Sequence, residues 1–257
     1  MKYIFTPLFI FSLLFTVSFP NEAAFAQKKQ TPVTDEDVAI AFYRTGDIQP
    51  SFADWAKNTK RYKATPLARR EAVMEEEVMR IKSLYFNYIP SRDYLFIQTS
   101  ANVRPYVVSE QGSENETYHL EINFSQDEDA FFFPYQYQEN NFAVLPMNLD
   151  DMLNVEISKG LYEELEGKTR GFTSYPFTIL MRPKEALTDR PLEYNGVPQW
   201  ILKTEIASAE IWSRRGALMW EYTAPWYISP NVETLNKLYE LKPDTAQNYG
   251  TIKALDF

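Results

Sequence analysis

The chain has 257 residues and a net charge of −9, and it contains no cysteine and a single histidine. These counts exclude disulfide frameworks, thiolate metal sites and multi-histidine metal centres, so we expect neither a metal nor a cofactor. Proteins bind nucleic acid largely by neutralising its phosphates with basic side chains. This chain is acidic, with a pI of about 4.9, so we do not expect it to bind nucleic acid. The composition therefore indicates an acidic, aromatic-rich globular protein.

The N-terminus has the layout of a secretory signal peptide. A lysine at position 2 supplies the positive start, residues 4–19 are mainly apolar, and Ala24-x-Ala26 has the small-x-small pattern that signal peptidase cuts. A membrane anchor is the alternative, but these 16 residues fall short of the ~20 apolar residues that a span needs. We therefore expect residues 1–26 to be removed, the mature chain to have no transmembrane span, and the product to be periplasmic or secreted.

Helical patterns fill the segment from about residue 34 to residue 90. Thr34 is suited to cap a first helix and Ser51 a second, because a side-chain hydroxyl accepts hydrogen bonds from the free N–H groups of the first turn. Thr65-Pro66 predicts the start of a third helix, since proline is favoured at the first helical position. Apolar residues then recur at helical spacing, namely Leu67, Met74, Val78, Ile81 and Tyr85.

A local run of basic residues spans the end of the second predicted helix and the start of the third. It comprises Lys60, Arg61, Lys63, Arg69 and Arg70. Glu71 and the glutamates at 75–77 follow at once. This balance of charge favours a solvated helix face over a binding site.

The apolar period changes to two from Tyr94 onward. The clearest strand is at 118–124, where Tyr118, Leu120, Ile122 and Phe124 alternate with polar residues. Further strands are predicted at 94–98, 103–108, 130–137, 142–145, 176–182, 200–213 and 217–223. A helical pattern returns at 148–166 and ends near Gly167, and a short helix is predicted at 231–241.

These patterns predict an α+β fold in which N-terminal helices pack on a largely antiparallel β-sheet. Strands follow helices without βαβ alternation, which argues against a doubly wound parallel sheet. No glycine- or serine-rich linker divides the chain. We therefore expect one domain over residues 27–257, with a helical part at about 34–90 and a strand-rich part at about 91–241.

The sequence contains partial matches to nucleotide-binding, metal-binding and nucleophile motifs, but none of them is complete. Gly167-Lys168-Thr169 ends like a phosphate-binding loop, but Tyr162 stands where the first glycine is required, so no nucleotide is expected. The acidic residues at 35–37 lack the spacing of a calcium loop and suit the positive end of a helix. His119 lies within a predicted strand and no nucleophile motif accompanies it. A solvated or hydrogen-bonded histidine is the simpler interpretation.

The aromatic residues are the unusual feature. Trp200, Trp212, Trp220 and Trp226 lie within 27 residues of one another, and such a cluster can fill a core, stack on sugars or line a groove. Pairing the strands across a two-residue Arg214-Arg215 turn would set Ala209 opposite Trp220. We then expect Trp220 to be buried and Trp212 to lie on the other face.

That register makes Glu210 and Glu221 diagonal neighbours beside Trp212. Two carboxylates beside an apolar ring are what glycoside hydrolysis requires, but acidic pairs on solvated sheet faces are common. The preferred hypothesis is a non-enzymatic binding or accessory module of the bacterial envelope, with Trp212, Glu210 and Glu221 holding an unknown ligand or partner. The alternative is a hydrolase of envelope polysaccharide in which Glu210 and Glu221 are catalytic.

Overall fold

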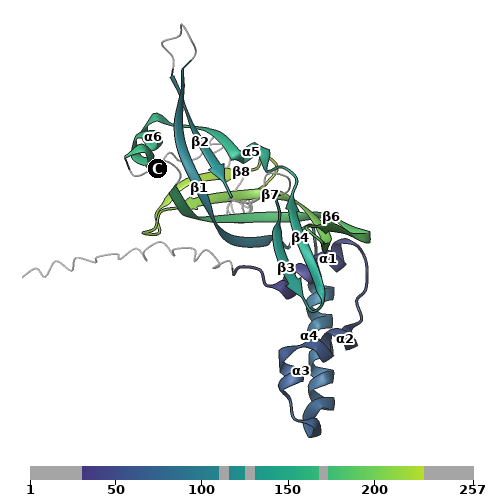
Figure 1. Cartoon of the computed structure of the whole chain (residues 1–257). Coiled ribbons are helices and arrows are strands. Elements are labelled where there is room, and N and C mark those ends of the chain that lie inside the picture. Colours follow the sequence, from purple (N-terminus) through teal and green to yellow (C-terminus); the bar gives the residue numbers. More distant parts are fainter. Residues whose placement is uncertain (1–30, 110–115, 125–130, 168–172, 229–257) are drawn as a thin grey trace, which may run out of the picture. The chain divides into compact units, whose positions relative to one another are not determined.

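An eight-stranded sheet carries the fold (Figure 1). The computed structural model describes residues 31–109, 116–124, 131–167 and 173–228. The strands are β1 Leu95–Ser109, β2 Glu116–Asn123, β3 Phe133–Tyr137, β4 Asn140–Pro146, β5 Asn154–Ile157, β6 Thr173–Tyr194, β7 Val197–Trp212 and β8 Leu218–Thr223. Their order is β3-β4-β7-β6-β1-β2-β5, and β8 pairs with the C-terminal part of β7, beyond β4. β4 runs parallel to β7, and every other pairing between described strands is antiparallel.

Most of the helical residues precede the sheet in the chain. The helices are α1 Asp35–Thr45, α2 Phe52–Asn58, α3 Lys60–Ala64, the 3-10 turn η1 Leu67–Arg69, α4 Arg70–Asn87, α5 Asp150–Leu153 and α6 Lys159–Glu166. The predicted α+β class is therefore confirmed. The chain divides into two units, Met1–Thr31 and Pro32–Phe257, and all the described elements belong to the second. The predicted signal peptide, with Ala24 and Ala26, and the predicted helix at 231–241 lie outside the described residues.

Side-chain caps begin the first two helices as the sequence predicts. The Thr34 hydroxyl accepts a hydrogen bond from the Asp37 N–H (3.3 Å), and the Asp37 carboxylate accepts one from the Thr34 N–H (2.8 Å). The Ser51 hydroxyl accepts from the Asp54 N–H in the same way (3.4 Å). These caps satisfy N–H groups that a helix leaves free in its first turn.

Two predicted boundaries are wrong. Thr65 is the C-cap of α3 rather than the N-cap of a long helix, and α4 begins only at Arg70, after η1. The helix predicted over 148–166 is interrupted by β5, which pairs with β2 through residues 118–121. Val155 and Ile157 are β-branched and alternate with polar residues, so pairing with β2 prevails over helical periodicity in this short segment.

Helix α1 packs on the sheet mainly through aromatic contacts. The Phe42 ring lies 5.4 Å from the Phe142 ring of β4 and 5.6 Å from the Trp200 ring of β7, measured between centroids. At the end of α1, a Cβ atom on Gly46 would meet the Thr188 methyl group of β6 at 2.5 Å. Glycine at this position therefore allows α1 to end close against β6.

The two faces of the sheet differ in character where β1, β6, β7 and β8 lie side by side. One cross-strand row is apolar and its first three members are buried: Ile97, Ile179, Ala209 and Tyr222. The adjacent row points to the other face and is polar: Gln98, Thr178, Glu210 and Glu221. The first row belongs to the hydrophobic core shared with the helices. The second row leaves polar groups on the face turned away from that core.

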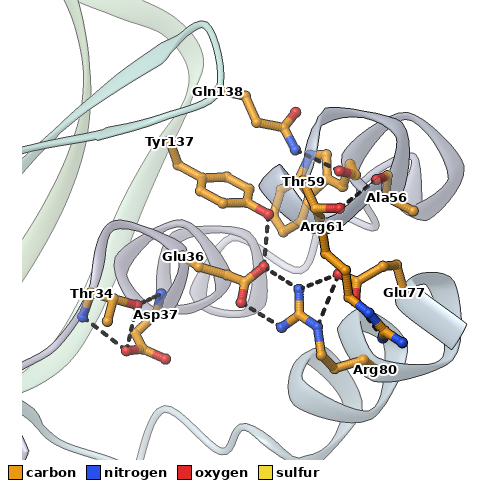
Figure 2. A network of polar contacts seen from close by, with 11 residues as sticks. Thr34, Glu36, Asp37, Ala56, Thr59, Arg61, Glu77, Arg80, Tyr137 and Gln138 are labelled. Carbon is orange, nitrogen blue, oxygen red and sulfur yellow. Dashed lines mark hydrogen bonds and ion pairs between the residues drawn. The ribbon is translucent and has the colours of Figure 1, made fainter. Parts of the chain in front are cut away.

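A network of ion pairs joins α1, α3, α4 and β3 (Figure 2). Both nitrogens at the end of the Arg80 side chain bond to Glu36 (2.6 and 2.9 Å), and Arg80 also bonds to Glu77 (3.1 Å). Arg61 bonds to Glu77 as well (3.1 Å), and the Tyr137 hydroxyl donates to Glu36 (2.8 Å). Glu77 is only 3% exposed, so its charge requires these two arginines.

We expect Glu36→Gln to lower the free energy of unfolding by about 1.5–3 kcal/mol at pH 7, the usual range for hydrogen bonds to a charged group. Burial acts to raise the pKa of Glu36, but the hydrogen bonds from Arg80 and Tyr137 and the Arg80 charge outweigh it and leave the pKa below its ordinary value. The stability that Glu36 contributes is therefore complete above about pH 5 and lost as the pH falls through the lowered pKa.

Urea unfolding at pH 7, 5, 4 and 3 tests this prediction. The wild type should lose stability on acidification, and Glu36→Gln should lose less over the same range. Glu75→Gln removes an exposed carboxylate from α4 and should change stability by no more than ~0.5 kcal/mol. Equal pH profiles for the wild type and Glu36→Gln would contradict the assignment.

Candidate functional site

The tryptophans close together in the sequence divide between the two faces of the sheet. Trp200 contacts Phe42 of α1 and donates its indole N–H to Asn140 (3.3 Å), and Trp220 packs against the hydrophobic core. Trp212 and Trp226 contact polar groups of the opposite face instead. The cluster is therefore part core and part surface.

The register of the β7–β8 hairpin differs from the predicted one. Ala209 pairs with Tyr222 and Ile211 pairs with Trp220, so the strands are offset by two residues. The turn has three residues rather than two, because Gly216 adopts a positive φ of 80° and the Ser213 N–H bonds to the Ala217 carbonyl (2.7 Å). A glycine with positive φ after a type I turn is the usual way to close a three-residue hairpin. A shift of two keeps Ala209, Ile211, Trp220 and Tyr222 on their predicted face. A bulge next to Trp212, which pairs with Leu218, reduces the offset to one residue beside the turn.

Trp212 is fixed on the outer face by two neighbours. Its indole N–H lies 3.0 Å from a Glu210 carboxylate oxygen and 3.3 Å from the Thr178 hydroxyl oxygen. The Thr178 hydroxyl donates to the same carboxylate oxygen (3.0 Å). The three side chains hold one another, so the half-buried indole ring has a defined orientation.

Glu221 lies directly opposite Glu210 and not diagonal to it. Its side chain is exposed, whereas that of Glu210 is half-buried. Directly opposed residues on one sheet face have Cβ atoms ~4.5–5.5 Å apart, and like charges in this position are destabilising. The predicted site residues Trp212, Glu210 and Glu221 are therefore neighbours in the structure.

The segment after β8 adds two more rings to the same face. The Arg182 guanidinium carbon lies 3.9 Å from the centroid of the Trp226 ring, and Tyr227 packs edge-on to Tyr94 with 5.5 Å between centroids. Ala224 begins this segment with an N–H bond to the Ala207 carbonyl (2.9 Å). We call this surface the aromatic face and define it by its rings and polar groups: Tyr94, Thr178, Arg182, Glu205, Glu210, Trp212, Trp226 and Tyr227.

Charges on the aromatic face are partly paired. Arg182 and Lys184 bond to Glu205 at 2.7 and 3.2 Å. Burial acts to raise the pKa of Glu205, but these two cations outweigh it and leave the pKa below its ordinary value. Burial, together with Tyr94 and the charge of Glu210, raises the pKa of Tyr227. Glu205 is thus an anion and Tyr227 a neutral hydroxyl at neutral pH, and both can hydrogen-bond to a ligand.

The aromatic face presents rings, carboxylates and a guanidinium. Among the residues that the structure describes, no group of three or more His, Asp or Glu side chains could hold a metal ion. His119 lies on β2, which β1 separates from β6, and it stacks on Tyr106 with ring centroids 5.4 Å apart. Its Nε2 atom contacts the Thr117 hydroxyl (3.1 Å). His119 therefore has local partners on β1 and β2.

Several residues of the aromatic face were not predicted from the sequence. Thr178, Leu180 and Arg182 are spaced two residues apart in β6 and therefore share one face of the strand. This spacing was a usable signal for the shared orientation of Thr178 and Arg182. Tyr94 and Tyr227 lie outside the regular strands and meet only through the tertiary fold. No local pattern could have joined them.

Comparisons with known proteins do not suggest a ligand for this face. No family model matches the chain, and neither a curated protein nor a solved structure is significantly similar to it. No helix of the described residues is long and apolar enough to cross a membrane. Function must therefore be argued from the site itself.

We expect Trp220→Ala to cost more stability than Trp212→Ala. Trp220 packs against the core from its place opposite Ile211. Truncating a fully buried tryptophan costs ~3–5 kcal/mol, so a half-buried one should cost about 2–4 kcal/mol. Trp212 loses fewer packing contacts and should cost about 1 kcal/mol, near the net value of a hydrogen bond.

Urea unfolding of both variants measures the difference. A larger loss for Trp212→Ala would mean that the outer face is the better packed of the two. Similar large losses would mean that both faces of the hairpin are buried.

Proposed function

We propose that this chain is an exported, non-enzymatic binding module of the bacterial cell envelope that holds a polysaccharide on its aromatic face. The observation that carries the proposal is the fixed Trp212 indole, held by Glu210 and Thr178 on the face turned away from the core. A ring fixed before binding loses little entropy when a ligand stacks on it. Preformed surfaces of this kind suit ligands that combine apolar and polar groups.

The chemistry of the neighbouring groups favours a sugar as the ligand. Pyranose rings present C–H groups on one side and hydroxyls at their edges, which match aromatic rings beside hydrogen-bonding side chains. Trp212 and Trp226 are half-buried, while Glu205 and Glu210 supply carboxylate acceptors. The Arg182 guanidinium, stacked on Trp226, adds a cation for an acidic sugar.

Hydrolysis of the same polysaccharide is the second candidate. The direct pairing of Glu210 with Glu221 favours it, because neighbouring side chains on one sheet face can bring their carboxyl groups close together. Retaining glycosidases use carboxyl groups ~5–5.5 Å apart. Against it, one Glu210 oxygen already accepts hydrogen bonds from both Thr178 and Trp212. Binding without cleavage is therefore the preferred proposal.

Export can be tested by determining the N-terminal residue of the protein isolated from its native cells. Cleavage after Ala26 predicts that protein recovered from the envelope or the medium begins at Gln27. N-terminal sequencing or intact-mass analysis would show this. A full-length chain that remains in the membrane fraction would contradict both the cleavage and the location.

Binding is tested with isolated cell-wall and capsular glycans. We expect Trp212→Ala to weaken binding by about tenfold or more, as a central aromatic contact does. Phe86→Ala is the matched control, since it removes an exposed ring (57% exposed) from α4, and it should leave affinity unchanged within about twofold. Equal affinity of the wild type and Trp212→Ala would contradict the proposal.

The same titrations separate binding from hydrolysis. If the chain only binds, the wild type releases no reducing ends from either glycan, and Glu210→Gln and Glu221→Gln change affinity alone. Release of reducing ends by the wild type, abolished by either substitution, would establish the hydrolase instead.

A further inference from the structure

The segment 60–70, here called the basic turn, contains an unusual concentration of positive charge. It comprises α3, the Thr65-Pro66 link, η1 and the first residue of α4. Five of its eleven residues are lysine or arginine, in a chain whose net charge is −9. The sequence alone favours a solvated face for this run. The structure separates its cations into two groups.

Two of the five cations have partners within the fold. Arg61 forms ion pairs with Glu76 and Glu77. Arg70 donates its Nε–H to the Thr65 carbonyl (3.0 Å) and lies over the Tyr62 ring at 5.7 Å. These contacts hold α3 and the start of α4 together. They account for Arg61 and Arg70 without any external ligand.

The other three cations, Lys60, Lys63 and Arg69, are exposed. No carboxylate of the described residues forms an ion pair with any of them. Lys60 and Lys63 are three residues apart on α3 and therefore lie on one side of it. The glutamates that balance this run in the sequence do not neutralise these three charges in the structure.

An apolar side chain stands among these charges. Leu67, the first residue of η1, is 80% exposed, more than any other large hydrophobic residue that the structure describes. Pro66 precedes it, and the small residues Ala64 and Ala68 beside it are also exposed. The basic turn thus carries an exposed leucine in the same short segment as three exposed cations, and nothing in the described fold covers it.

We propose that the basic turn docks on the surface of an anionic phospholipid bilayer. Lysine and arginine side chains are attracted to anionic headgroups, and an apolar side chain between them can enter the boundary of the acyl chains. An exposed leucine within this basic segment suits lipid better than a purely polar polyanion, which offers no hydrocarbon.

The charge of the rest of the chain restricts how the protein can sit on such a surface. A net charge of −9 is repelled by anionic lipid, so attraction is confined to the basic turn and is weakened by salt. This proposal is independent of glycan binding, because the aromatic face lies on β6, β7 and the segment after β8. Either proposal can fail while the other holds.

Co-sedimentation with lipid vesicles tests the proposal. All the described helices and strands lie in Pro32–Phe257, so a chain that begins at Gln27 keeps them and lacks the apolar segment 4–19. We expect it to bind phosphatidylcholine vesicles that contain about 30% phosphatidylglycerol, to bind pure phosphatidylcholine weakly, and to dissociate in about 0.5 M NaCl.

Two variants of the basic turn and one control define the surface. Lys60→Glu with Lys63→Glu should lower the partition coefficient by about tenfold or more, and Leu67→Ser by about threefold to tenfold. Arg214→Glu with Arg215→Glu changes net charge by the same amount at the exposed β7–β8 turn and should retain more binding than the lysine variant. Circular dichroism should show all three variants folded.

Three outcomes would overturn the proposal. One is equal binding of the wild type and the lysine variant. Another is an equal loss in the arginine control, which would mean that net charge alone governs adsorption. The third is full binding by Leu67→Ser together with equally tight binding of the wild type to soluble heparin, which would identify the turn as a site for an acidic polymer.

Discussion

Alternation of side chains along β6 and β7 is the constraint on which the rest of the structure depends. Successive residues of a strand point to opposite faces, so Ile179 and Ala209 can be buried only if Thr178 and Glu210 point the other way. Helix α1 packs on β4 and β7 through Phe42. The polar row is then left on the outer face, where it fixes the Trp212 indole.

The ion-pair network of Figure 2 restricts how the helices meet the sheet. Glu77 is buried with Arg61 and Arg80 as partners, and Arg80 also holds Glu36 of α1. Buried ion pairs add little net stability, but a displaced partner would leave a charge without compensation. The network therefore favours one arrangement of α1, α4 and β3 over alternatives, while packing of Phe42 on the sheet supplies apolar burial.

The fold class and the faces of the strands could be read from the sequence, because both depend on periodicity. The predicted hairpin register was wrong by two residues, yet Trp212 and Trp220 lie on their predicted faces, since an even shift preserves alternation. β5 was missed because four residues are too few to display a period against a helical background. Tyr94 and Tyr227 lie outside the regular strands and meet only through tertiary packing, so local patterns carry no record of their contact.

The central claim is that the aromatic face binds a ligand. NMR of protein labelled with nitrogen-15 tests this claim directly during a titration with wall or capsular glycan. The spectra show an indole N–H resonance for each of the five tryptophans. We expect the resonances of Trp212 and Trp226 to move. Those of Trp55 and Trp200, which pack with α1 rings, should stay in place. Movement of Trp55 or Trp200 alone, or no movement at any glycan concentration, would contradict it.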